Sequence, residues 1–171
     1  MRHYKFFRET HKWFGIVLAV VFLNIAVTGF LLLEKKNFSW VQPETMQSVQ
    51  GSTESFITNQ QLFEKVFSQG HDDFQTIEDV DRVDFRPDKR VFKVRSKRNF
   101  SEIQIDAVTG DILSNAKRNS DLIEALHDGS LFGGFVHAFI MPMTALATVY
   151  LTLTGLYLWL AITVKRFKRR G

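Results

Sequence analysis

The sequence predicts a membrane protein in which two transmembrane α-helices flank a small extracytoplasmic α+β domain of helix plus antiparallel sheet. Two uncharged apolar segments, residues 13–33 and 138–164, lie near the two ends of the 171-residue chain. The residues between them are charged and contain short alternating patterns typical of strands. Basic residues gather at both chain ends, which sets the expected orientation in the membrane.

The first span is expected over residues 13–33, after a short N-terminal segment at residues 1–12. These 21 residues carry no charge, and as a helix they would reach about 31 Å, enough for a hydrocarbon core of about 30 Å. The apolar run is longer than that of a signal peptide, and Glu34, Lys35 and Lys36 follow it in place of a cleavage site. We therefore expect an uncleaved anchor.

The middle of the chain is expected to hold a polar linker at residues 34–56 and an α+β domain at residues 57–118. Thr58 or Asn59 can cap a helix that carries an apolar stripe and ends by Gly70. The expected strands cover residues 80–85, 91–94, 100–105 and 112–113. A tight turn at residues 106–111 joins the last two strands, since Gly110 permits a positive φ and Asp106 can bond turn backbone groups.

A basic run at residues 89–98 alternates along one of these strands. It could contact an acidic partner, but the pattern favours a solvated face of the sheet. Another short segment has side chains of the kind that bind metal ions, namely His71, Asp72 and Asp73. We prefer to interpret it as a solvated turn.

The second span is expected over residues 138–164. A short helix and a glycine-rich re-entry segment at residues 119–137 lead into it, and a basic tail at residues 165–171 follows it. Pro142 suits either the first turn of this span or a kink. The span is longer than a bilayer requires, so tilt or an interfacial start is expected.

Charge distribution predicts that both termini are cytoplasmic and that the central domain lies outside. Residues 1–12 carry a net charge of +3 and residues 165–171 a net charge of +5, whereas everything between carries −4. Cytoplasmic segments are enriched in Lys and Arg, and the two ends outweigh the opposing Lys35 and Lys36. Nucleic-acid-binding proteins carry a basic surface, whereas the part of this chain between its ends is acidic. The expected partner is therefore the lipid bilayer and not nucleic acid.

The sequence lacks the residues and motifs of several common enzyme classes. With no cysteine in the chain, a disulfide framework, an iron–sulfur cluster, a thiolate zinc site and a cysteine nucleophile are excluded. Phosphate-loop, GxSxG, HExxH and GxGxxG motifs are absent as well. We predict no catalytic residue and no metal-ligand cluster.

Several short motifs, in a fixed order, resemble the PepSY-associated transmembrane helix family. They lie at residues 11–15 and 28–29, at 105–112 with the pattern D-x-x-T-G-x, at 126–129 and 132–133, and at 154–159. The resemblance implies a bacterial cytoplasmic (inner) membrane protein with a PepSY-like periplasmic domain. Larger members pass electrons through haem to ferric siderophores or accompany flavin-carrying periplasmic proteins, which implies a role in electron transfer linked to iron or flavin and a possible periplasmic redox partner. A non-catalytic membrane-anchored PepSY module that binds or regulates another envelope protein is the alternative.

Two histidines stand at the same spacing from a Thr-Gly pair. His11 precedes Thr28 and Gly29 by 17 and 18 residues, and His137 precedes the Thr-Gly pair at 154–155 by the same amounts. Eighteen residues make five helical turns, so each histidine shares a helix face with its glycine. Small residues on such a face allow close helix packing, with the histidines at the interfaces, and they equally leave room for a porphyrin.

The haem hypothesis requires two copies of the chain. Bis-histidine ligation needs two imidazoles at one depth, whereas His11 and His137 of one copy lie at opposite membrane faces. A homodimer or larger membrane complex would pair His11 with its mate inside, and His137 or His127 with its mate outside, around haem b. His127 has a second interpretation, because it ends a short helix and the helix dipole favours a histidine at that position. Asn24 and Thr28 are expected to bond across to Thr152 or Tyr150, or to line a polar path.

Overall fold

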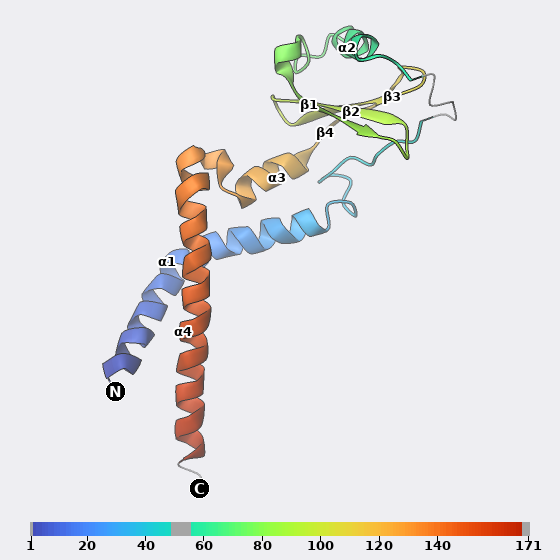
Figure 1. The fold of residues 1–171 in the computed structure, drawn as a ribbon. Helices are drawn as coiled ribbons and strands as arrows, with labels where there is room; N and C mark the ends of the chain where they lie inside the picture. Colours follow the sequence, from blue (N-terminus) through green and yellow to red (C-terminus); the bar gives the residue numbers. More distant parts are fainter. Residues whose placement is uncertain (1, 49–55, 169–171) are drawn as a thin grey trace. The chain divides into compact units, whose positions relative to one another are not determined.

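The computed structural model describes residues 2–48 and 56–168, and Figure 1 shows the order of its elements. The chain divides into two units, Met1–Phe30 with Glu124–Gly171, and Leu31–Ile123. The first is a helical unit that contains most of both apolar segments, and the second is the α+β domain. Parts of the expected linker (49–55) and of the basic tail (169–171) lie outside the described residues.

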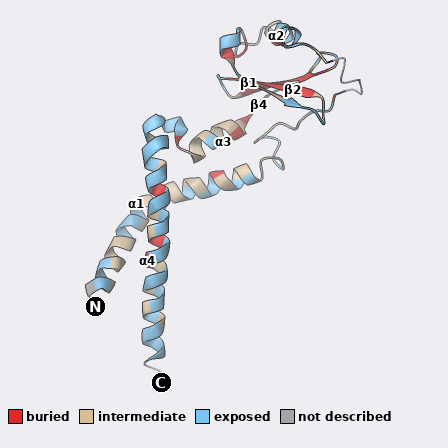
Figure 2. Cartoon of the chain, in the orientation of Figure 1, coloured by how far each residue is buried: buried red, intermediate tan, exposed pale blue. Residues whose placement is uncertain are grey.

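Two helices of membrane-spanning length make up most of the helical unit. They are α1 (Arg2–Leu33) and α4 (Met141–Phe167), and α4 continues from a π-helical turn, η4 (Val136–Ile140). The candidate spans are His3–Leu33 and Val136–Phe167, and only 6% and 11% of their most apolar windows are buried. Figure 2 shows α4 exposed over most of its length and α1 as a mixture of exposed and intermediate residues. Long apolar helices without protein cover are suited to lipid and not to a soluble core.

Pro142 lies in the first turn of α4, directly after the π-helical turn. Proline has no N–H to donate to the carbonyl four residues earlier, and a widened turn accommodates the missing bond. Of the two expected placements, a first turn or a kink, the structure shows the first turn of α4.

Aromatic and hydroxyl side chains join α1 to α4 near the two chain ends. The hydroxyl oxygens of Thr10 and Tyr150 lie 2.7 Å apart. The ring of Phe14 packs edge-on against Tyr150, and that of Phe7 packs edge-on against Tyr157. Residue numbers rise along α1 as they fall along α4, so the helices run antiparallel at this contact.

The α+β domain consists of a helix packed on a four-stranded antiparallel sheet. Its elements are α2 (Asn59–Phe67), η2 (Ile77–Asp79), β1 (Val80–Arg86), β2 (Val91–Ser96), β3 (Ser101–Asp106) and β4 (Ile112–Lys117). The strands are hydrogen-bonded in the order β1-β2-β3-β4. After β4, α3 (Asn119–His127) and η3 (Ser130–Phe132) lead toward the second span. The predicted α+β architecture between two apolar helices is confirmed.

One face of the sheet forms the apolar core under α2. Thr58 caps this helix in a capping box with Gln61, as a Thr followed by Gln three residues later predicts. The fully buried members of the core are Leu62, Val66, Phe74, Val94, Ile103 and Ile105. The strand members alternate along β2 and β3, so the side chains between them must project from the opposite face.

The turn between β3 and β4 forms as predicted. The Asp106 carboxylate accepts hydrogen bonds from the backbone N–H groups of Val108 and Thr109, at 2.7 and 3.1 Å. Gly110 has a φ of +76°, in the left-handed region that glycine tolerates. This turn joins β3 to the edge strand β4 and so sets their register.

The opposite face of the sheet is charged but not solvated. Lys93 is 2% exposed, Arg95 6% and Glu102 1%. The prediction of a solvated basic face is therefore wrong for the two basic residues that lie in the middle of β2. Burial lowers the pKa of Lys93, while the neighbouring Glu102 carboxylate favours its charged form.

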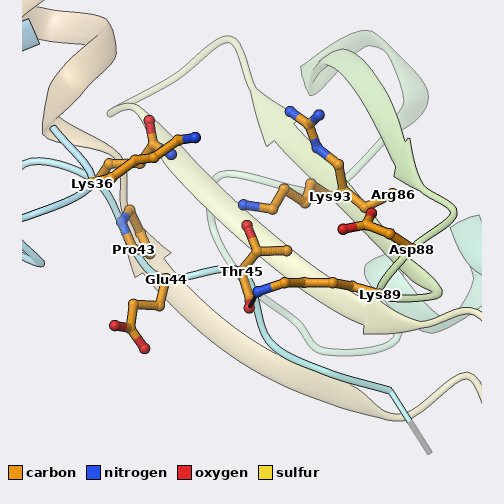
Figure 3. Close-up of a pocket in the computed structure, with 9 residues that line it drawn as sticks. Lys36, Pro43, Glu44, Thr45, Arg86, Asp88, Lys89 and Lys93 are labelled. Carbon is orange, nitrogen blue, oxygen red and sulfur yellow. Dashed lines mark hydrogen bonds between the residues drawn. The ribbon is translucent and has the colours of Figure 1, made fainter. Parts of the chain in front are cut away.

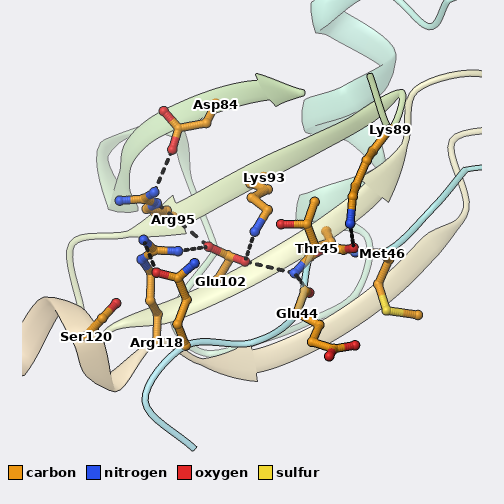
Figure 4. A network of polar contacts seen from close by, with 12 residues as sticks. Glu44, Thr45, Met46, Asp84, Lys89, Lys93, Arg95, Glu102, Arg118 and Ser120 are labelled. Carbon is orange, nitrogen blue, oxygen red and sulfur yellow. Dashed lines mark hydrogen bonds and ion pairs between the residues drawn. The ribbon is translucent and has the colours of Figure 1, made fainter. Parts of the chain in front are cut away.

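Glu102 is the centre of this buried polar network, which Figure 4 shows. Its carboxylate accepts from Lys93 Nζ at 3.2 Å, Gln104 Nε2 at 2.9 Å and Arg118 Nη1 at 3.1 Å. Further ion pairs join Arg95 to Asp84 at 2.7 Å and Arg118 to Asp121 at 2.7 Å. Opposite charges thus replace apolar packing on this side of the sheet.

The cover for this network comes from the segment that was expected to be a linker. Val41 is fully buried, and the backbone N–H of Met46 donates to Gln104 Oε1 at 2.8 Å. Gln104 Nε2 donates in return to the Glu44 carbonyl at 2.8 Å, and the N–H of Ser48 donates to the Lys89 carbonyl at 3.0 Å. Residues 41–48 therefore lie along the sheet and bind to it.

Candidate functional site

The first candidate site joins His11 of α1 to α4 and is called the His11 clamp (His11, Thr154, Gly155). His11 Nδ1 lies 2.9 Å from the hydroxyl oxygen of Thr154. A Cβ on Gly155 would lie 3.3 Å from His11 Cε1, so the imidazole rests against the glycine backbone. Any larger residue at position 155 would press on the ring.

A second site of the same composition, the His127 clamp (His127, Thr28, Gly29), joins the end of α3 to α1. His127 Nδ1 lies 2.9 Å from the hydroxyl oxygen of Thr28. A Cβ on Gly29 would lie 3.4 Å from His127 Cε1. Each clamp is therefore a histidine on one helix held by a Thr-Gly pair on another.

Hydrogen bonding in the clamps favours one tautomer of each imidazole ring. Thr154 donates its single hydroxyl proton to the Tyr150 carbonyl at 2.8 Å, and Thr28 donates its own to the Asn24 carbonyl at 2.6 Å. With that hydroxyl proton on the carbonyl, each threonine oxygen can accept from Nδ1–H, and in this tautomer of the neutral ring the lone pair is on Nε2. No hydrogen bond to Nε2 of either ring is found within residues 2–48 and 56–168.

The two clamps lie far apart along α1. His11 and Thr28 are 17 positions apart in one helix, or about 25 Å at 1.5 Å per residue. Two imidazoles on one iron must both bind it directly, so the two histidines of one copy cannot share an iron. The clamps are separate sites near opposite ends of the same helix.

His137 lies outside both clamps. It is exposed on the π-helical turn η4, and its Nδ1 lies 3.0 Å from the carbonyl oxygen of Asp128 and 3.6 Å from the carboxylate. Burial raises the pKa of Asp128, but hydrogen bonds from Ser130 and the nearby histidines outweigh this and hold it below its usual value. His137 and His127 are thus placed differently, and only His127 contacts the Thr-Gly pair of a span.

The partners of the polar residues in α1 differ from those expected. Asn24 Nδ2 donates to the Leu126 carbonyl at 3.0 Å, at the end of α3, and not to Thr152 or Tyr150 of α4. Thr28 bonds His127. The spacing of His11 and His137 from the two Thr-Gly pairs was the signal available in the sequence. It could not show that His11 contacts the pair in α4, or that His127 in place of His137 contacts the pair in α1.

The acidic loop at 71–73 has a structural role. Asp73, expected in a solvated turn, is 6% exposed and accepts hydrogen bonds from Ser101 Oγ at 2.6 Å and Asn99 Nδ2 at 2.8 Å. The bond from Ser101 holds the pKa of Asp73 below its usual range. Among the residues that the structure describes, no cluster of three or more His, Asp or Glu side chains is placed to hold a metal ion.

Two membrane-length helices flank a small helix-on-sheet domain and are joined by polar clamps, which defines a two-span membrane protein with a soluble domain between its spans. The chain belongs to the PepSY-associated TM region family, which matches it over residues 8–171. The resemblance predicted from the sequence motifs is confirmed over nearly the whole chain. No curated protein and no solved structure matches the chain.

Proposed function

We propose that this protein is a small haem-bearing or accessory subunit for electron transfer across a bacterial inner membrane, linked to extracytoplasmic iron or flavin reduction. The observation that supports the proposal is the pair of clamps, because in each the imidazole Nδ1 lies 2.9 Å from a threonine hydroxyl and Nε2 has no hydrogen bond within the described residues. Histidines that ligate a metal usually donate the other ring N–H to a fixed acceptor, which sets ring orientation and tautomer. Thr154 and Thr28 are such acceptors.

The residues fit haem b if two copies of the chain come together. His11 of each copy would supply the ligands at one end of the helical unit, and His127 of each copy those at the other end, with His137 as a second candidate there. When bound, haem supplies a one-electron carrier whose potential depends on its axial ligands and their hydrogen bonds. Thr154 and Thr28 hold the imidazoles in place, while Gly155 and Gly29 let the rings lie against the helix backbone.

An absorption spectrum of the full-length protein, purified in detergent after expression with added haem, tests the proposal. We expect a Soret band with sharp reduced α bands, a haem content that falls by about half in His11→Ala or His127→Ala, and none in the double variant. His3→Ala is the matched control, because His3 is an exposed histidine of α1 outside both clamps. A colourless folded protein, or clamp variants that keep all the haem, would exclude the haem role.

The threonine acceptors give a second measurement. Thr154→Val removes the hydrogen bond to His11 but keeps the side-chain shape, so haem affinity is expected to fall by about ten- to a hundredfold. Thr163→Val is the control, since this exposed threonine of α4 bonds only its own helix, at the Trp159 carbonyl. Equal haem affinity in the two variants would show that the clamp does not position a ligand.

The orientation is part of the same proposal: both termini in the cytoplasm and the central domain in the periplasm. The natural chain has no cysteine, so single cysteines report their own surroundings. Lys5→Cys should resist an impermeant thiol reagent in intact cells, whereas Met46→Cys, at an exposed position of the α+β domain, should react. The reverse pattern would place the domain in the cytoplasm.

A second function has its own support, namely a non-catalytic membrane-anchored PepSY module that binds or regulates another envelope protein. Each clamp is already a complete helix–helix contact, with one side-chain hydrogen bond and one close glycine. In this case the histidines serve packing alone. The haem-free outcome of the spectral test, together with lower stability of His11→Ala and His127→Ala, would favour this function.

A further inference from the structure

A groove on the α+β domain gathers basic side chains next to the end of the first span. It has a volume of about 450 Å³ and is lined by residues of the segment after α1, of the sheet-bound segment 41–48 and of the β1–β2 hairpin. Four of its lining residues are cations, Lys36, Arg86, Lys89 and Lys93, and two are carboxylates, Glu44 and Asp88. The lining therefore has an excess of positive charge.

The cations keep free hydrogen-bonding capacity toward the groove. Lys89 Nζ donates to the Thr45 carbonyl at 2.7 Å, and Lys93 Nζ pairs with Glu102 at 3.2 Å, so each ammonium retains further N–H groups. Arg86 and Lys36 form no ion pair within the described residues. Figure 3 shows Lys36 reaching in from the segment after α1 while Arg86 and Lys93 come from the sheet, and the Glu44 carboxylate points away from them.

The covalent position of Lys36 fixes the depth of this groove. It is three residues beyond Leu33, the last residue of α1, so it lies within about 11 Å of the end of the span even if the chain is fully extended. That is the level of lipid head groups, since the polar regions add several ångströms to each side of the hydrocarbon core. Lys35 and Lys36 also lie on the side of the membrane where the positive-inside rule disfavours Lys and Arg. Their presence there is consistent with a local role in binding an anion.

We propose that this groove binds a phosphate group at the membrane surface. The Arg86 guanidinium and the Lys36 and Lys89 ammonium groups suit phosphate oxygens, since Arg supplies a planar pair of donors and Lys a compact charge, while the charge of Lys93 is already paired with Glu102. Basic side chains close to the membrane surface are attracted to anionic lipid head groups, by about 1 kcal/mol for each Lys or Arg. The same chemistry would hold a free phosphate, so the two sources are separated by experiment.

The test uses the full-length protein in a neutral detergent and two probes, dihexanoyl phosphatidylglycerol and inorganic phosphate, with dihexanoyl phosphatidylcholine as the zwitterionic comparison. Binding is measured by native mass spectrometry and by titration calorimetry. The groove variant is Lys36→Gln with Arg86→Gln, because both side chains are exposed and their loss should leave the fold intact. The control is Arg82→Gln with Lys117→Gln, which removes the same charge from exposed positions outside the groove.

We expect one phosphatidylglycerol to bind per chain, about thirtyfold more weakly in the groove variant and unchanged in the control. Binding of phosphatidylglycerol alone identifies a lipid head group as the ligand, and competition by millimolar inorganic phosphate identifies a free phosphate; both support the site. Binding of neither probe would overturn the proposal. So would equal loss in the groove and control variants, or equally tight binding of phosphatidylcholine.

Discussion

Neutralising the centre of the buried network gives the most demanding test of the fold. In Glu102→Gln the side-chain shape stays but the charge is lost, which leaves Lys93 and Arg118, at 2% and 9% side-chain exposure, without their buried counterion. Lys93 has no other ion-pair partner in the described part of the chain. Breaking a buried pair from one side costs about 3–5 kcal/mol, so the α+β domain should lose a large part of its stability.

Hydrogen exchange of the full-length protein in detergent measures this loss through the amides of β2 and β3. We expect their protection to fall by about two to three and a half orders of magnitude. Asp81→Asn removes an exposed carboxylate of β1 and should change protection by less than about 0.5 kcal/mol. In Lys93→Met with Glu102→Gln the stranded ammonium is gone, so the protection should partly recover. If the protection of the β2 and β3 amides fell no further in Glu102→Gln than in Asp81→Asn, the reasoning about the buried cations would be refuted.

Three further changes follow from local geometry. Gly129→Ala would place a Cβ 2.8 Å from the Met141 side chain at a φ of +76°, which adds left-handed backbone strain of about 1–2 kcal/mol. Gly134→Ala is the control, because its Cβ would meet nothing within 4 Å, and thermal unfolding in detergent should show the larger loss for Gly129→Ala. Because the pKa of Asp73 lies below its unfolded value, its contribution to stability is present above about pH 4 and is lost as pH falls through the folded pKa. Asp73→Asn should flatten the acid limb of a pH series of hydrogen exchange, and an unchanged limb would contradict this. Thr10→Val removes a hydrogen bond between the two spans and should cost only about 0.6 kcal/mol in a reversible unfolding assay, with a loss above 2 kcal/mol arguing against this estimate.

Local patterns in the sequence were sufficient for the elements of the fold. Uninterrupted apolar runs predict the spans, the Thr58 cap predicts α2, and alternation predicts the strands, because these signals depend on near neighbours. The burial of Lys93 and Arg95 could not be predicted in the same way. Alternation shows which side chains share a face, but the cover on that face comes from residues 41–48 and Arg118, which are distant in sequence.

The candidate sites show the same limit. Helical spacing singled out His11 and both Thr-Gly pairs, each of which does contact a histidine, but it also singled out His137, which contacts neither pair. It placed each pair on one helix face, whereas the contacts are made between helices, and His127 rather than His137 contacts Thr28. Contacts between helices depend on how the helices cross, which no residue pattern within one helix records.

Because α1 supplies the histidine of one clamp and the Thr-Gly pair of the other, its two ends are mechanically linked. Adding a single alanine between residues 16 and 23 would turn one end about 100° relative to the other, so the helix could satisfy one clamp or the other but not both. The two clamps are therefore coupled through α1, because a rotation of one part of the helix against the other breaks the alignment that both clamps require.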